Sequence, residues 1–346
     1  MAMQWPIGSV VLITGLQSAV GQELNGQRCE VCSVDKDTGR LCLRLNPADA
    51  PHKWKRIKPE NTKAAFVRGF VEEKGQGMIA ACPIRKGEIL VEEDPILEIG
   101  RTFVRIPLSQ DGASSTTALD SHLMSQFKLL SKEAQDDYME LADCHDQGDP
   151  ARKTVHNIFL TNNLSNAEMG SNAVYLQLSR FNHSCSPNAE FAPASASTGR
   201  LKACVHATRP ISCGEEICIS YVSEVEPRAV RQQKLLERYN FICRCVACGV
   251  PCSEKSDENR ARIQELCKKF EVDDLMVHGM SARRTLDECT EAFALMEQEQ
   301  LCFPFYEVHL HQAAEAVYSS LDRWEQAAEC EKKALESASI VYPRQM

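Results

Sequence analysis

Three short segments in the middle of the chain constrain its fold more than any other feature. They are Lys74-Gly75-Gln76-Gly77, Arg180 to Asn188 (RFNHSCSPN) and Gly214 to Tyr221 (GEEICISY), separated by about 105 and 30 residues. Taken singly, the first segment is typical of a turn and the third of a strand end. The second places Asn, His, Ser and Cys around a proline, a combination too polar to fill a core. The order and spacing of the three are therefore the main guide to the fold.

A cysteine-rich segment follows at Tyr239 to Cys248 (YNFICRCVAC). The chain has 17 cysteines and no export signal at its start, which indicates reduced thiols rather than a disulfide scaffold. Cys243, Cys245 and Cys248 supply three thiolates, whereas a structural zinc ion needs four ligands. Spacing alone leaves Cys185 and Cys252 both open as the fourth.

Together these segments resemble the SET domain of protein lysine methyltransferases and its cysteine-rich post-SET segment. With the helical pattern after residue 250, they resemble most the SET- and MYND-domain (SMYD) group. The resemblance is specific over residues 64–250 and loose beyond them. It departs between residues 100 and 155, where that group inserts a zinc-binding MYND finger and this chain has Cys144 and His145 but no CxxC pairs. We therefore carry over no partner-binding role of that finger.

The resemblance implies S-adenosylmethionine as methyl donor, one structural zinc ion and specific roles for residues. The Tyr221 hydroxyl is expected to orient the lysine amine, because a phenol with a pKa near ~10 is a poor base at neutral pH. Phe159 and Tyr239 are expected to line the lysine channel, and Cys185 to complete the zinc site of Cys243, Cys245 and Cys248. Cofactor contacts are expected from Lys74, Gly75, Gln76, Gly77, Asn157, Ser179, Asn182, His183, Tyr221 and Phe241.

The expected fold class is α+β, with short β-sheets and a helical insert. We expect a small SH3-like β module over residues 1–62, closed by a strand at Ile57 to Thr62. A SET domain over residues 63–225 is expected to hold the helical insert at about 101–155. The post-SET zinc segment is expected over residues 226–252, and a helical region over 253–346 with one tetratricopeptide-like hairpin turning at Leu321 to Arg323.

Several residues invite a functional interpretation but are better explained by structure. Trp5 and Trp54 are expected in the core of the β module rather than in an aromatic cage. Cys29, Cys32, Cys204, Cys213 and Cys218 fall in strand patterns and are expected to be packed thiols. The basic run of His52, Lys53, Lys55, Arg56 and Lys58 is expected to be a solvated face.

Charge and hydropathy exclude several protein classes. The net charge of −9 gives no general attraction to nucleic acid. No apolar run approaches the ~18 residues of a membrane helix, and the first residues lack the basic region of a signal peptide. We expect a monomer in the cytoplasm, the nucleus or both, acting on a lysine-bearing protein or peptide such as a histone, without membrane or nucleic-acid binding.

Two other interpretations compete with an enzyme. An inactive SET scaffold could recruit partners through the β module and the helical tail, but it need not retain Tyr221, Asn182-His183 and the glycine turn together. A chromatin reader would need an aromatic cage in the β module, and the sequence does not identify one.

Overall fold

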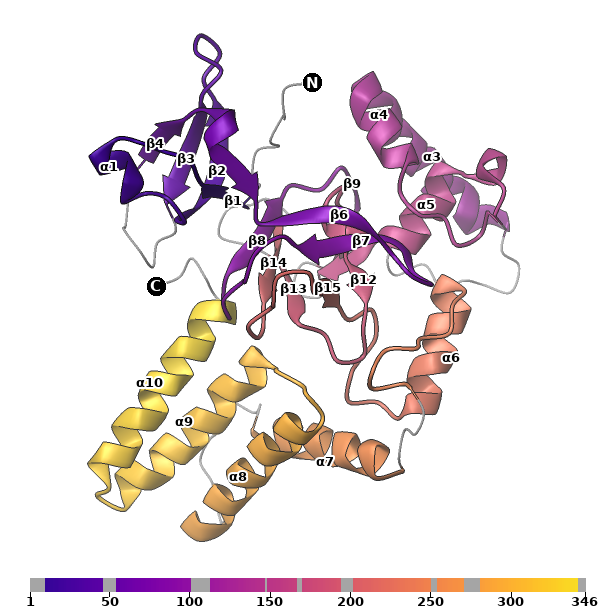
Figure 1. The fold of residues 1–346 in the computed structure, drawn as a ribbon. Helices are drawn as coiled ribbons and strands as arrows, with labels where there is room; N and C mark the ends of the chain where they lie inside the picture. Colours follow the sequence, from indigo (N-terminus) through magenta and orange to yellow (C-terminus); the bar gives the residue numbers. More distant parts are fainter. Residues whose placement is uncertain are drawn as a thin grey trace. The chain divides into compact units, whose positions relative to one another are not determined.

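The computed structural model describes residues 10–45, 54–100, 113–146, 148–166, 170–193, 202–249, 254–270 and 281–341. The chain forms two compact units. The first unit holds residues 1–181 and 191–217, and the second holds residues 182–190 and 218–346. Figure 1 labels most of the helices and strands of both units.

The first unit begins with a five-stranded antiparallel sheet of strand order β4-β3-β2-β1-β5. Leu41, Leu43 and Leu45 of β3 are buried while the residues between them are partly exposed, because successive side chains of a strand point to opposite faces. These leucines pack with Val11 and Ile13 of β1. The elements are β1 (Val10–Ile13), α1 (Ala19–Gln22), β2 (Arg28–Val34), β3 (Leu41–Leu45), β4 (Trp54–Ile57) and β5 (Thr62–Ala64).

The last part of this sheet differs from the predicted strand at Ile57 to Thr62. Strand β4 ends at Ile57, a 3-10 turn covers Pro59–Asn61, and β5 begins at Thr62. The proline accounts for the break, since it has no N–H to donate to a strand ladder. The prediction of one continuous strand here is wrong.

Trp54 is also placed differently from the prediction. Its side chain is 58% exposed on the edge strand β4, so the prediction of a core tryptophan is wrong at this position. Arg56 and Lys58 beside it are exposed, as predicted for a solvated face. Trp5, His52 and Lys53 lie outside the described residues.

The cysteines predicted to be packed divide into three groups. Cys29, Cys204 and Cys218 are buried in strands, as expected. Cys32 is only half-buried. Cys213 is exposed, and the prediction is wrong for it because it lies in a turn before a strand, where Gly214 has a φ of +85°.

A buried ion pair ties the N-terminal sheet to the rest of the first unit. Arg28 of β2 and Glu88 are both nearly inaccessible, and their side chains form an ion pair. Arg28 Nη2 also donates to the Cys82 Sγ at 3.4 Å, and a Glu88 oxygen accepts from the Arg85 N–H at 3.1 Å. A buried charge is costly without its partner. The sheet is therefore an integral part of the first unit.

The motif Lys74 to Gly77 lies at the tight end of a β-hairpin. Strands β6 and β7 pair along their length, and β7 pairs on its other side with Glu216 and Ile217 of β15. Two small sheets accompany the hairpin, with strand orders β10-β11-β9 and β13-β14-β8. The strands are β6 (Phe66–Val71), β7 (Gly75–Ala80), β8 (Ile89–Glu93), β9 (Leu97–Ile99), β10 (Leu164–Asn166), β11 (Ser171–Val174), β13 (Ala189–Pro193), β14 (Ala203–Ala207) and β15 (Glu216–Ile219).

The helical insert is present and packs around its own core. Helices α3 (Ala113–Leu129), α4 (Lys132–Met139) and α5 (Val155–Asn162) bury Leu123, Tyr138 and Ile158 together. The Tyr138 hydroxyl donates to the Val155 carbonyl at 2.9 Å, which satisfies the one polar atom of that buried ring. Ser131 and Thr154 accept from backbone N–H groups as N-caps of α4 and α5.

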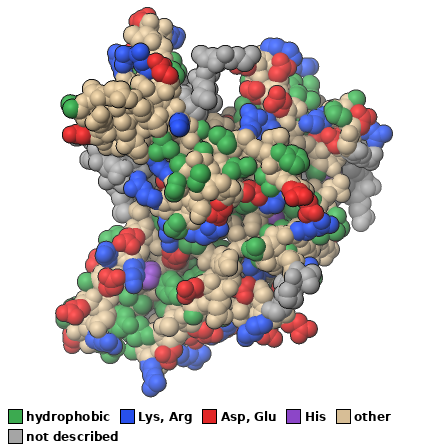
Figure 2. Space-filling view, viewed as in Figure 1, with side chains coloured by type: hydrophobic (Ala, Val, Ile, Leu, Met, Phe, Trp, Pro, Cys, Tyr) green, Lys and Arg blue, Asp and Glu red, His purple; other side chains and the backbone are tan. Residues whose placement is uncertain are grey.

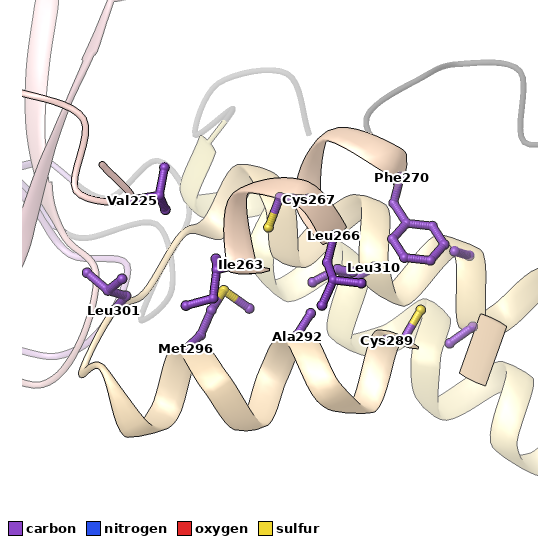
Figure 3. Packing of buried hydrophobic residues seen from close by; sticks show 12 residues of the cluster. Val225, Ile263, Leu266, Cys267, Phe270, Cys289, Ala292, Met296, Leu301 and Leu310 are labelled. Carbon is purple, nitrogen blue, oxygen red and sulfur yellow. The ribbon is translucent and has the colours of Figure 1, made fainter. Parts of the chain in front are cut away.

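Five helices make up most of the second unit, and the predicted helical C-terminal region is present. They are α6 (Arg228–Tyr239), α7 (Glu254–Phe270), α8 (Ala282–Gln298), α9 (Pro304–Ser320) and α10 (Trp324–Val341). Figure 3 shows the apolar side chains of α7, α8 and α9 gathered between the helices, with Ile263, Ala292 and Leu310 among them. Helices α9 and α10 meet at Asp322, whose φ is +56°. The hairpin α9–α10 thus continues a larger packed bundle.

The surface carries charge of both signs. On the face shown in Figure 2, Lys and Arg side chains are interspersed with Asp and Glu over the strands and helices. None of the described helices combines the length and the apolar character needed to cross a bilayer.

Candidate functional site

The polar motif Asn182 to Asn188 lies along the end of β15 in the second unit. Strand β12 (Asn182–His183) pairs in parallel with Cys218 and Ile219. Asn188 extends this pairing with two hydrogen bonds: its side-chain Oδ1 accepts from the Cys218 N–H at 2.8 Å, and its backbone N–H donates to the Cys218 carbonyl at 3.3 Å. Asn188 therefore holds the motif in place instead of presenting a reactive group.

Four aromatic rings gather beside this motif. The ring centroid of Tyr221 lies 5.3 Å from that of His183 and 4.8 Å from that of Tyr239. The ring centroid of Phe241 lies 6.0 Å from that of His183 and 6.4 Å from that of Tyr239. The Arg238 guanidinium lies 5.2 Å from the Tyr239 centroid. Such ring faces suit a flat heterocycle or a cationic centre. Four predicted site residues are thus neighbours, although they come from three separate stretches of sequence.

Both nitrogens of the His183 ring have protein partners. The Tyr221 N–H donates to Nδ1 at 3.0 Å, and Nε2 lies 3.2 Å from the Cys185 Sγ. The ring is nearly buried, with 4% of the residue exposed. A cofactor contact from His183 would therefore come from its main chain or its ring face.

Four cysteines form a compact sulfur cluster beside the aromatic rings. The sulfurs of Cys185, Cys243, Cys245 and Cys248 all lie within 4.8 Å of one another. Two backbone groups point at them: the Cys185 N–H donates to the Cys245 Sγ at 3.3 Å, and the Cys245 N–H to the Cys243 Sγ at 3.5 Å. Cys252 lies outside the described residues.

This cluster has the chemistry of a structural zinc site. A structural zinc ion can take four thiolates in tetrahedral geometry at about 2.3 Å each, and four sulfurs within 4.8 Å of one another can surround such an ion. Hydrogen bonds from Cys185 hold the pKa of Cys245 well below its ordinary value and lower that of Cys248 to about 6. Hydrogen bonds with Cys243, Cys245 and Cys248 raise the pKa of Cys185. Only part of the cluster therefore loses protons readily, and a bound metal cation would have to displace the remaining thiol protons.

Helix α6 fixes the cysteine segment through its polar side chains. The Gln232 amide makes two hydrogen bonds with Cys243, accepting from the backbone N–H at 2.9 Å and donating to the carbonyl at 2.7 Å. Arg228 Nε donates to the Cys248 carbonyl at 3.0 Å. A planar amide that bonds both backbone groups of one residue fixes the position of that residue. The segment is thus held by the helix that precedes it as well as by its sulfurs.

Arg231 of the same helix brings a positive charge to the sulfur cluster. It is fully buried, with Nη2 at 3.5 Å from the Ala247 carbonyl and 3.8 Å from the Cys248 Sγ, and Nη1 donating to the Glu226 carbonyl. Four thiolates around a divalent zinc carry a net charge of about −2. If these four cysteines held a zinc ion, the guanidinium would offset part of that charge in a water-poor environment.

The predicted residues of the glycine turn lie in the first unit. Gly75 has a φ of +80°, a left-handed conformation that favours glycine at the hairpin turn, and Gly77 pairs with Gly69 across the hairpin. Lys74 forms an ion pair with Glu216 at 2.6 Å. Gln76 pairs with Phe70. The turn therefore has a structural reason for its first glycine, independent of any ligand.

Three further predicted residues lie in or near α5. The Asn157 N–H donates to the Thr154 side chain as part of the helix N-cap, and the Ser179 hydroxyl donates to the Asn162 carbonyl at 3.4 Å. Phe159 is 1% exposed and packs in the core of the helical insert. The structure thus gives Phe159 a packing role, and its part in a lysine channel stays a prediction.

Sequence patterns assigned no role to Arg231, Gln232 or Asn188. A buried arginine looks like any surface arginine in a charged helix, and only the fold reveals that Arg231 turns toward the sulfurs. Cys144, considered at the place of the absent finger, bonds to Thr161 through its backbone N–H at 3.2 Å. Over the part of the chain that the structure describes, neither Cys144 nor His145 joins a metal-binding group.

Comparison with known proteins agrees with this geometry. Residues 75–222 match the SET domain family. The chain is 31% identical over 182 residues to the histone-lysine N-methyltransferase set5 of Schizosaccharomyces pombe, covering 52% of this chain and 49% of that protein. It is 25% identical to human N-lysine methyltransferase SMYD2, covering 51% and 42%, and 34% identical to the Arabidopsis thaliana histone-lysine N-methyltransferase ASHR2, covering 27% and 24%.

These matches cover half or less of each relative's own length, so the chain spans at most about half of the curated relatives named here. The SET match of this chain begins at Gly75 in the glycine turn and ends one residue after Tyr221, so it contains the motif Asn182 to Asn188. Residues 75–222 therefore belong to the SET-domain family, with relatives among the histone-lysine methyltransferases and the SMYD proteins.

Proposed function

We propose that this chain is an S-adenosylmethionine-dependent protein-lysine N-methyltransferase. The observation that supports this most strongly is the position of Tyr221, near the end of the SET segment and among the rings of His183, Tyr239 and Phe241. An inactive scaffold has no need for a tyrosine held in an aromatic cluster beside an intact motif.

Methyl transfer to a lysine amine needs few reactive side chains, but it needs the two reacting groups to be positioned accurately. The sulfonium of S-adenosylmethionine supplies the methyl group when it is bound. The lysine nitrogen must be neutral and in line with that carbon, so that the new N–C bond forms as the S–C bond breaks and the nitrogen then loses a proton to water. Tyr221 orients the amine through its hydroxyl, and an aromatic wall at Tyr239 favours the neutral lysine by excluding water.

We propose that the cofactor is held by residues from each of the sequence motifs. Asn182 offers a side-chain amide at the start of β12, and Phe241 offers a ring face for the adenine. The His183 contribution is assigned to its main chain or ring face, since its ring nitrogens are engaged. The remaining proposed contacts are Lys74, Gly75, Gln76, Gly77, Asn157, Ser179 and Tyr221.

We further propose that Cys185, Cys243, Cys245 and Cys248 bind one zinc ion. The ion would fix the segment that carries Phe241 and Tyr239, because both residues precede Cys243 by a few positions. Zinc here has a structural role, and the methyl transfer does not pass through it.

The direct test is transfer of a tritium-labelled methyl group from S-adenosylmethionine to histones and to a cell lysate. We expect labelled protein with the wild type. Tyr221→Phe keeps the ring and removes only the hydroxyl, so turnover should fall by about 10²-fold while the cofactor Kd changes little. Asn182→Ala should instead weaken cofactor binding, as measured by calorimetry. Failure of the zinc-loaded wild type to bind the cofactor would favour the scaffold function.

We also propose a monomer of the cytoplasm or nucleus whose partner is a lysine-bearing protein, histones included. The relatives named as histone-lysine methyltransferases support a protein substrate, and the net charge of −9 argues against direct nucleic-acid binding. Light scattering after size exclusion tests the monomer, and the mass of a dimer would refute it.

A further inference from the structure

We propose that the His183 side chain is a positioning residue that couples the zinc site to Tyr221. It would do so through its two ring nitrogens, one bonded to the Tyr221 backbone and the other to the Cys185 sulfur. This inference rests on the proposed function for its catalytic consequence, while its consequence for metal binding does not depend on activity.

The hydrogen bond from Tyr221 sets the tautomer of the ring. A backbone N–H can only donate, so His183 Nδ1, at 3.0 Å, must be the unprotonated acceptor. In a neutral imidazole the hydrogen is then on Nε2. That N–H lies 3.2 Å from the Cys185 Sγ, within hydrogen-bonding reach of sulfur. Each nitrogen therefore has one defined role, acceptor toward Tyr221 and donor toward Cys185.

The local fold explains why the ring reaches both groups. His183 pairs with Ile219, the last residue of β15, and Tyr221 follows two positions later, beyond the strand ladder. Since Tyr221 lies beyond the end of β15, its backbone N–H donates to the His183 ring and not to a neighbouring strand. Cys185 is two residues beyond His183 and fully buried.

Each bond has a separate physical consequence. Donation to the Cys185 Sγ would stabilise the negative charge that this sulfur carries as a metal ligand, and loss of a hydrogen-bond partner of a metal ligand typically lowers metal affinity by about 10–100-fold. Acceptance from Tyr221 fixes the backbone from which the tyrosine ring projects, and the two rings are 5.3 Å apart. Displacement of a positioned group by about 1 Å can cost on the order of 10²-fold in rate.

Two substitutions separate the two bonds. In His183→Asn, the side-chain oxygen can occupy the place of Nδ1 and still accept from the Tyr221 N–H, but the shorter side chain can no longer donate a hydrogen bond to the Cys185 Sγ. In His183→Gln, the side-chain nitrogen can occupy the place of Nε2 and still donate to Cys185, but the acceptor for Tyr221 is lost. His183→Ala removes both bonds and serves as the common reference.

The experiment measures zinc affinity and turnover on the full chain. A chromogenic chelator competes for zinc, and tritiated methyl transfer is followed at saturating cofactor and in excess zinc. We expect zinc affinity to fall about 10–100-fold in His183→Asn and to stay near the wild-type value in His183→Gln. We expect the opposite order for kcat, with His183→Gln the more impaired. Circular dichroism confirms that each variant is folded.

The outcomes distinguish failure of this inference from failure of the proposed function. Equal effects of Asn and Gln on zinc affinity, or no effect of Ala, would overturn the coupling through His183. A normal zinc pattern with no methyl transfer by the wild type would overturn the proposed function instead and leave the bond to Cys185 supported.

Discussion

Replacement of Arg28 by methionine tests whether the N-terminal sheet is an integral part of the first unit. The guanidinium of Arg28 is the ion-pair partner of the Glu88 carboxylate, and both residues are less than a tenth exposed. Methionine keeps the apolar length of the side chain and removes its charge. The carboxylate would keep its hydrogen bond from the Arg85 N–H but would be left buried without a counter-charge.

The expected cost follows from this burial. Removal of one partner from a buried ion pair destabilises a protein by about 3–5 kcal/mol, because the remaining charge stays desolvated. For a unit of about 200 residues, 1 kcal/mol lowers the midpoint of thermal unfolding by about 2–4 °C. Arg28→Met should therefore lower the midpoint by at least about 6 °C.

Thermal unfolding by circular dichroism measures this effect. Arg56→Met is the matched control, since Arg56 of the same sheet pairs with Asp35 at 3.3 Å but is 70% exposed, and exposed ion pairs contribute little to stability because water screens them. Adding Glu88→Gln to Arg28→Met should restore part of the loss, because the uncompensated charge is then gone. If Arg28→Met unfolded at the same temperature as Arg56→Met, the argument from the buried pair would be refuted. Deletion of residues 1–62 should be destabilising for the same reason.

Three further predictions concern the sulfur cluster and a buried carboxyl group. Cys185→Ser should release zinc and abolish methyl transfer, whereas Cys252→Ser should do neither; atomic absorption beside a methylation assay decides, and the reverse result would remove Cys185 from the site. Arg231→Met should lower zinc affinity measurably without changing its stoichiometry, because the buried positive charge beside Cys248 is lost; unchanged competition with a chelator would contradict this. Burial raises the pKa of Glu93 from 4.5 to about 7, against hydrogen bonds from the backbone N–H groups of Gln177, Leu178 and Leu176. The folded state then binds more protons than the unfolded state between these values, so the contribution of Glu93 to stability should fall as pH rises from about 5 to 7. Urea unfolding at several pH values measures this slope, and a slope that persists in Glu93→Gln would assign it to another group.

Local sequence patterns predicted the secondary structure best where one physical rule dominates. The alternation of Leu41, Leu43 and Leu45 in the sequence is typical of a half-buried strand, which β3 is. Apolar residues at three- and four-residue steps after residue 121 are typical of helices, and the structure buries Leu123 and Tyr138 of this stretch in helices. The errors lie where local pattern and tertiary environment disagree. Trp54 is apolar but lies on an edge strand, and Cys213 resembles a strand residue but belongs to a turn.

The sequence by itself determined the motifs, their order and the family that they indicate, because a SET domain is recognisable from a few polar residues at fixed separations. It also determined that three thiols lie close together, since CxCxxC allows little else. Only the tertiary structure decided that Cys185 lies with these three thiols. It also decided that Arg231 approaches the Cys248 sulfur, that Gln232 binds the Cys243 backbone, and that the His183 ring contacts both Cys185 and Tyr221. The physical reason is that burial and hydrogen bonding join residues distant along the chain. A charged or polar side chain has no local signal that tells whether water or a buried partner will satisfy it.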